Sequence, residues 1–132
     1  MPDMSLHETP MLLRYWDHVG GTLAEEFAAV RGSATASPRR LDGVIVPGGE
    51  RRRVAPTALD VAGRDIIVVR AKASRLGMYL MGQALFSREL MKPFRPASIR
   101  TVALCAKDDS VLRPLAEEYG IEVVVDEPGP GT

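Results

Sequence analysis

The sequence predicts an α/β fold of three layers, with helices on both faces of a central mixed sheet whose C-terminal strands are parallel. Short apolar segments at 41–46, 65–72, 99–105 and 121–126 have the length and composition of strands. The last three are separated by longer, helix-like segments, and this β-α-β-α-β alternation favours parallel strands joined by right-handed crossovers. Within the segment 65–72, Ile66, Ile67, Val68 and Val69 are apolar at consecutive positions, which predicts burial on both faces.

The N-terminal part predicts two helices. Thr9-Pro10 is typical of a helix start, and Gly20-Gly21 interrupts the apolar pattern that follows. Thr22-Leu23-Ala24-Glu25 then has the capping-box pattern, so we expect a second helix that ends near Arg31. Residues 32–38 form a polar linker.

The middle of the chain predicts two strands and a loop. Leu41–Val46 reads as a short strand that Pro47-Gly48-Gly49 ends, and 47–64 as a loop with a weak strand near Val54. The next strand spans about Asp65–Lys72.

In the C-terminal part, Ser74 is a candidate cap for a long helix over Arg75–Lys92. A strand over 99–105 and a helix over 111–119 follow, the helix capped by Asp108-Asp109-Ser110. A final strand covers 121–126. We expect one domain over 1–127 and a flexible tail at 128–132.

Composition narrows the function classes. The chain has 132 residues and zero net charge, but residues 31–75 carry ten basic and four acidic side chains. The single cysteine, Cys105, excludes an internal disulfide, and its apolar neighbours predict a buried, inert thiol. No segment approaches the ~18 apolar residues of a membrane span. We expect a cytoplasmic protein without a membrane partner.

Charged residues in three predicted elements stand out as candidate site residues. Arg70 and Lys72 end the buried strand on one face, at the strand end where open α/β sheets usually bind ligands. Asp42 shares its strand face with Val44 and Val46, so its carboxylate needs a partner, unless it forms an Asx turn before Gly43. In the predicted second helix, Glu26 leans toward the apolar face and Glu25 points away from it.

A helix glutamate, a strand aspartate and a strand ending in x-x-Lys, followed by a helix and a parallel strand, resemble the PD-(D/E)xK nuclease superfamily over about residues 9–107. The resemblance implies a restriction-endonuclease-like core (α-β-β-β-α-β), here extended by a further α-β unit. It implies that Glu26 and Asp42 hold a divalent metal, Mg²⁺, and that Lys72 assists the attacking water. The implied activity is metal-dependent hydrolysis of DNA phosphodiesters.

Arg70 departs from this motif because it occupies the position of an acid. Two carboxylates and water could still bind Mg²⁺. Alternatively, Arg70 replaces the metal by pairing with the acids, or it points toward a nucleic-acid phosphate. The rival hypothesis is therefore a catalytically degenerate domain of the same fold that binds nucleic acid or protein. A third is an unrelated doubly wound module with its site at Asp108.

Further residues are candidates for binding. The run Arg51-Arg52-Arg53 lies in the predicted loop over 47–64. Its simpler interpretation is a solvated loop, and its sharper one is a loop that contacts phosphates. The apolar helix Leu76–Met91 predicts either deep burial or a homodimer contact. The candidate nucleic-acid contacts are Arg70, Arg51, Arg52, Arg53 and Arg75.

Overall fold

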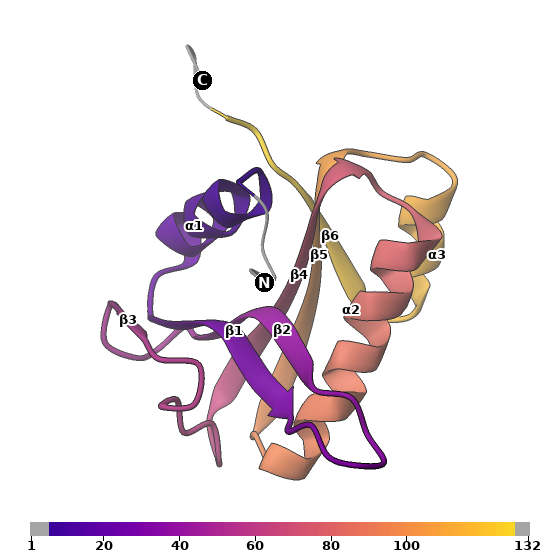
Figure 1. The fold of residues 1–132 in the computed structure, drawn as a ribbon. Helices are drawn as coiled ribbons and strands as arrows, with labels where there is room; N and C mark the ends of the chain where they lie inside the picture. Colours follow the sequence, from indigo (N-terminus) through magenta and orange to yellow (C-terminus); the bar gives the residue numbers. More distant parts are fainter. Residues whose placement is uncertain (1–5, 129–132) are drawn as a thin grey trace.

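The computed structural model describes residues 6–128 and has an α/β fold with three layers (Figure 1). Helix α1 covers one face of a six-stranded mixed sheet, and helices α2 and α3 cover the other. The predicted fold class is confirmed at this level. The elements are α1 (Glu8–Val19), β1 (Thr22–Val30), β2 (Arg39–Val46), β3 (Arg52–Val54), β4 (Asp65–Arg75), α2 (Met78–Met91), a 3-10 turn (Lys92–Phe94), β5 (Ser98–Lys107), α3 (Leu112–Glu118) and β6 (Ile121–Val125).

The strand order of the sheet is β3-β1-β2-β4-β5-β6. Strands β1, β2 and β4 are joined by antiparallel pairing, whereas β4, β5 and β6 are parallel, as the sequence predicts for its C-terminal strands. The short strand β3 runs parallel to β1 at one edge. It occupies the place of the weak strand expected near Val54.

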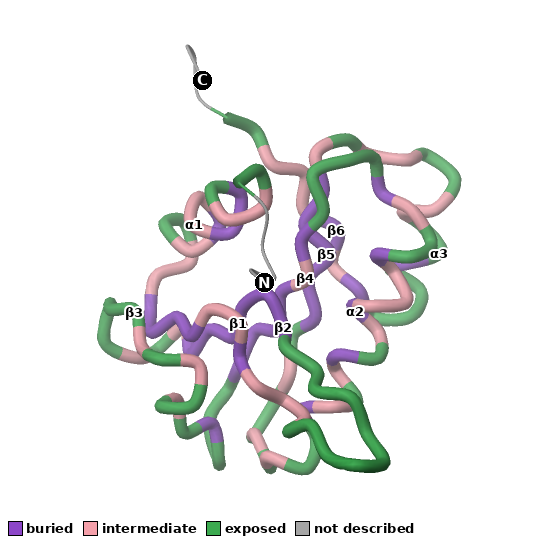
Figure 2. Tube along the Cα trace, in the orientation of Figure 1, coloured by how far each residue is buried: buried purple, intermediate pink, exposed green. Residues whose placement is uncertain are grey.

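Strand β4 lies at the centre of the sheet and is buried on both faces, as predicted (Figure 2). Ile67 and Val69 pack in the cluster beneath α1. Ile66 and Val68 pack in the cluster on the opposite face, together with Met91 from the end of α2. Two apolar layers therefore meet on the N-terminal half of this strand and hold it in place.

The prediction of a helix over 22–31 is wrong, because Thr22–Val30 is strand β1. Leu23 and Ala24 are both fully buried, but in clusters on opposite faces of the sheet. Such alternation suits a strand, and β1 pairs with β2 along most of its length and with β3 over its first three residues. Tertiary packing has overridden a local sequence with good helix formers. Within the strand, Glu26 has a positive φ of 53°, which interrupts the regular alternation.

Other boundaries shift only slightly. Strand β4 continues to Arg75, so α2 begins later than the expected start at Arg75. The side chain of Asp109 accepts hydrogen bonds from the backbone N–H groups of Val111 and Leu112, and this confirms the predicted cap of α3. None of the helices within residues 6–128 is long and apolar enough to span a membrane. The predicted tail at 128–132 falls almost wholly outside the described residues.

Cys105 is fully buried in β5, between β4 and β6. Burial raises the pKa of its thiol above the ordinary value, and nearby Asp108 adds to the rise. The expectation of a buried thiol is confirmed.

Candidate functional site

The candidate site lies where strands β2 and β4 part. Their antiparallel pairing ends at Gly43 and Val69. One residue beyond, the Oδ2 atom of Asp42 accepts a hydrogen bond from the Ala71 N–H at 2.7 Å. The carboxylate thus supplies the partner that the Ala71 amide would otherwise lack at this fork. The sequence predicts that Asp42 needs a partner, and the structure gives it a backbone amide of β4.

Arg70 fills the fork from the β4 side. Its Nε atom lies 3.3 Å from Asp42 Oδ2, and the side chains of Arg70 and Asp42 are only 16% and 11% exposed. The Nε–H does not align for a hydrogen bond, so the pair is held by charge. The Nη1 atom donates to Ser87 Oγ on α2 at 3.2 Å and to the Arg40 carbonyl oxygen at 3.3 Å. The guanidinium therefore ties β4 to both β2 and α2.

Glu8, at the first turn of α1, is a site residue that the sequence analysis missed. Its Oε2 atom accepts a hydrogen bond from the Ala73 N–H at 3.0 Å. This contact joins the start of α1 to the end of β4, 65 positions later in the chain.

The electrostatics of the fork follow from burial. Desolvation raises the pKa of the Asp42 carboxyl above its ordinary value. The charge of Arg70 and the Ala71 N–H oppose this rise, whereas the neighbouring Glu8 carboxylate adds to it. Two carboxylates and one guanidinium thus share one small region at the end of β4.

The other predicted site residues lie beside the fork. Glu26 was expected on a helix but lies on β1. Its Oε1 atom is 4.0 Å from the Nη1 atom of Arg40. Lys72 is exposed, with its Nζ atom 5.8 Å from the ring centre of Tyr79 on α2. Arg70 and Lys72 both reach α2, which agrees with the prediction that they share a strand face.

The donor set at the fork does not fit a divalent cation. The Oδ2 atom of Asp42 already accepts the Ala71 N–H and faces a guanidinium, and Glu8 Oε2 is engaged by Ala73. A permanent positive charge at this distance would repel a metal ion. Within residues 6–128, no group of three or more His, Cys, Asp or Glu side chains is arranged to hold a metal.

A groove of about 820 Å³ opens in front of the fork. The start of β2 forms one wall and the exposed side of α2 forms the other, while Asp42, Arg70 and Ser87 line it between them. Three arginines and one aspartate line this groove, and the aspartate is paired with Arg70. The remaining lining residues are Pro38, Met78, Tyr79, Gly82, Gln83, Phe86 and Leu90.

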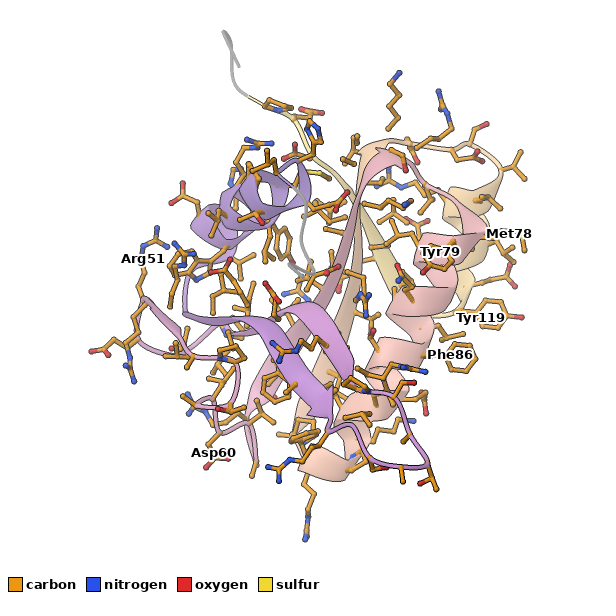
Figure 3. All side chains as sticks on the ribbon, viewed as in Figure 1. Arg51, Asp60, Met78, Tyr79, Phe86 and Tyr119 are labelled. Carbon is orange, nitrogen blue, oxygen red and sulfur yellow. The ribbon has the colours of Figure 1, made fainter. Side chains whose placement is uncertain are left out.

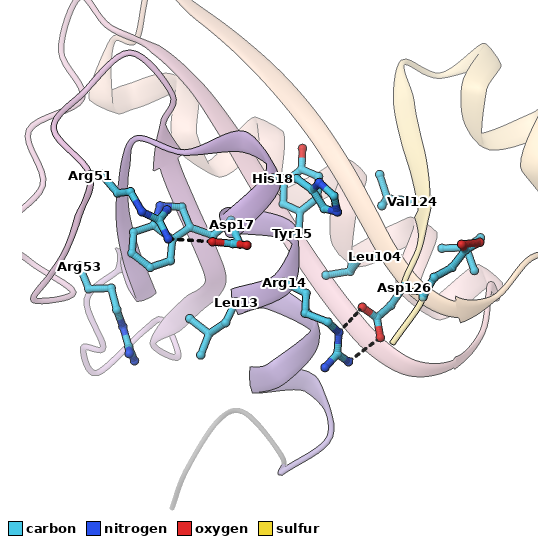
Figure 4. Close-up of a pocket in the computed structure, with 13 residues that line it drawn as sticks. Leu13, Arg14, Tyr15, Asp17, His18, Arg51, Arg53, Leu104, Val124 and Asp126 are labelled. Carbon is cyan, nitrogen blue, oxygen red and sulfur yellow. Dashed lines mark hydrogen bonds and ion pairs between the residues drawn. The ribbon is translucent and has the colours of Figure 1, made fainter. Parts of the chain in front are cut away.

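A second cavity, of about 710 Å³, lies beside α1 (Figure 4). Two of the predicted nucleic-acid contacts, Arg51 and Arg53, line this cavity. Arg51 pairs with Asp17 at 2.8 Å and lies over the Trp16 ring, and Arg53 pairs with Glu25. These arginines belong to the β3 edge, which β1 and β2 separate from β4. The structure does not bring them to the fork.

Arg52 lies on β3 and pairs with Glu50 at 2.8 Å. Arg75 and Asp108 lie at the C-terminal end of β5. Arg75 donates a hydrogen bond to the Asp108 carbonyl oxygen, and Asp108 pairs with Arg113 at 2.9 Å. The Arg113 guanidinium lowers the pKa of the Asp108 carboxyl. The Asp108 carboxylate therefore orders the start of α3.

Comparison of the chain with protein-family models, curated proteins and solved structures finds no match.

Proposed function

We propose that the chain is a nucleic-acid-binding domain with the core of the PD-(D/E)xK nucleases and a site that has lost metal-dependent catalysis. Several observations support this core. Elements α1, β1, β2, β4, α2 and β5 follow the family's order, with β3 as an added edge strand and α3–β6 as an extension. In this alignment the helix acid falls to Glu8, the strand acid to Asp42 and the lysine to Lys72.

The observation that carries the loss of catalysis is the Arg70–Asp42 pair. Arg70 occupies the position of the second strand acid, and its guanidinium lies against the carboxylate that a metal would need. A protein-supplied cation thereby takes the role of the counter-charge. Metal-dependent DNA hydrolysis, the leading hypothesis from the sequence, stays a prediction, and the cleavage experiment described below tests it.

The basic side chains support the binding function. Arg39 and Arg40 are exposed on one wall of the groove, and Lys72 is exposed beside the other. Residues 31–75, which include all three, carry the excess of basic over acidic side chains. A local basic surface on a neutral chain attracts phosphates to one place.

The test combines cleavage and binding. We expect the protein to leave single- and double-stranded DNA intact in Mg²⁺ or Mn²⁺, and to bind nucleic acid equally well in EDTA, with affinity that falls as salt rises. DNA degradation that the Lys72→Ala variant abolishes, when purified in parallel, would overturn the loss of catalysis. Failure to bind any nucleic acid at low salt would overturn the binding function.

A further inference from the structure

We infer that the groove between the start of β2 and α2 binds a single-stranded nucleic acid, with bases stacked on Tyr79 and Phe86 and phosphates held by Arg39 and Arg40. This inference rests on the proposed function, since it assigns a ligand class to the same groove. Exposed aromatic rings, a gap between them and a basic wall opposite together carry it.

The aromatic rings are unusually open for a helix that covers a sheet. Tyr79 is 70% exposed and Phe86 is 66% exposed, and both line the groove. Figure 3 shows both side chains on the outer side of α2. Exposed rings in a basic groove have the chemistry of a base-stacking surface, because every base offers an aromatic face.

The spacing of the two rings suits stacked bases. Tyr79 and Phe86 are seven residues apart, which places them on one side of the helix and about 10 Å apart along its axis. Gly82 lies between them, and a Cβ built there would meet no atom within 4 Å. Bases stack at intervals of about 3.4 Å, so the open space between the rings has room for about two of them.

The charges of the groove complement a phosphate backbone. Arg39 and Arg40 lie on the wall opposite the rings, and Lys72 lies beside Tyr79. Asp42 is the acidic residue of the lining, and Arg70 neutralises it. A strand lying along the groove would meet Arg39 and Arg40 on one side, where its phosphates would compete with Glu26 for Arg40. On the other side it would meet the ring faces and Lys72.

This arrangement favours a single strand over a duplex. Bases within a duplex are stacked on each other, so their faces are hidden from protein side chains. A duplex could use only the arginine wall. A single strand could use both walls, and the difference in affinity reports the contribution of the rings.

The experiment measures fluorescence anisotropy with labelled 12-nucleotide oligothymidine and oligouridine and with a 12-base-pair DNA duplex. We expect either single strand to bind at least about tenfold more tightly than the duplex. Tyr79→Ala and Phe86→Ala should each weaken single-strand binding roughly tenfold and change duplex binding little. Comparing the two oligonucleotides tells DNA from RNA as the preferred ligand.

Two further variants sharpen the test. Gly82→Leu fills the gap between the rings in a position with open space, so it should weaken single-strand binding while the protein remains folded. The Arg39→Ala, Arg40→Ala double variant should weaken binding to both ligands and reduce the log–log salt slope by about 1.4 for the single strand. Matched controls are Tyr119→Ala, an exposed ring directly after α3 and outside the groove, and Arg52→Ala on the β3 edge.

Two outcomes would overturn this inference. Equal affinity for single strands and duplex, unchanged by Tyr79→Ala and Phe86→Ala, would leave the proposed binding function intact and reject the stacking surface. A dimer in sedimentation experiments that Phe86→Ala dissociates, together with no binding of oligonucleotides, would make this face the predicted homodimer contact and reject both proposals.

Discussion

The Nε atom of Arg70 lies 3.3 Å from the Oδ2 atom of Asp42, in a fork where two neighbouring strands part. This pair joins β4 to β2 after their backbone pairing has ended. Because both side chains are largely buried, each depends on the other for its counter-charge. A substitution at either residue should therefore lower the free energy of unfolding. It should affect ligand binding only as a consequence of this loss of stability.

Arg70→Glu would introduce an acid at the position where the proposed nuclease-like core expects one. We expect it to lower the free energy of unfolding by about 3 kcal/mol or more, because two carboxylates then face each other at the fork. Millimolar Mg²⁺ should recover part of this loss by binding between them, whereas Mg²⁺ should leave the melting temperature of the wild type unchanged. Thermal melts with Mg²⁺ and with EDTA measure both effects. Arg64→Glu, at an exposed arginine before β4, is the control. A variant that does not respond to Mg²⁺ would argue against the nuclease-like placement of these acids.

Asp42→Ala removes both the ion pair and the acceptor for the Ala71 N–H. We expect a loss of about 3–5 kcal/mol in urea unfolding, because Arg70 is left buried without its partner. Asp42→Asn should cost less, since the amide oxygen can still accept the Ala71 N–H. The double change Asp42→Ala, Arg70→Ala should cost less than the sum of the single changes. Additive losses would show that the two side chains act independently.

The raised pKa of Asp42 predicts a pH dependence with a definite sign. In the folded chain Asp42 takes up its proton at a higher pH than in the unfolded chain, so between these two values the folded state binds more protons. Folding is then favoured by acid in the window just above the ordinary aspartate pKa. The stability of wild type relative to Asp42→Asn should rise as the pH falls from neutral into this window. Asp108 and Glu122, whose pKa values are lowered by Arg113 and Arg100, act in the opposite direction in both proteins and cancel in the difference. Urea unfolding of both proteins across this pH range measures the difference, and a constant difference would contradict the prediction.

Glu8→Gln should lower the pKa of the Asp42 carboxyl, because it removes a neighbouring negative charge. Carbon-detected NMR titration of the Asp42 carboxyl measures the change, with Glu50→Gln as a distant control. The glutamine can still accept the Ala73 N–H, so hydrogen exchange of that amide should stay slow. Glu8→Ala should speed it up. An Asp42 pKa that is the same in Glu8→Gln and in wild type would show that the Glu8 charge does not act on the Asp42 carboxyl.

The sequence predicts well those elements whose local pattern agrees with their packing. Strand β4 has apolar side chains at consecutive positions and is buried on both faces, so composition alone identifies it. The prediction of a helix over 22–31 was wrong because the segment contains good helix formers. The pairing of β1 with β2 and β3, which makes it a strand, involves residues later in the chain. A capping-box pattern carries no information about such distant partners.

The candidate site was predictable in part. Asp42 and Arg70 stand out because polar groups at the ends of buried strands need partners. The role of Glu8 could not be read from its position, since its partner Ala73 is an ordinary backbone amide 65 residues away. The misplaced helix led to Glu26 as the helix acid of the nuclease resemblance, whereas the proposed core takes this acid from Glu8 on α1.

Burial of Cys105 makes its thiol a probe of local opening of the fold. The side chain packs in the cluster beneath α2 and α3 and its pKa is raised, so a reagent reaches the thiol only when this layer opens. The rate at which a thiol reagent modifies the native protein therefore measures the free energy of that opening. A ligand that binds at the β4 fork and stabilises the fold would slow the modification of Cys105 without contacting it. The labelling rate would therefore detect ligand binding.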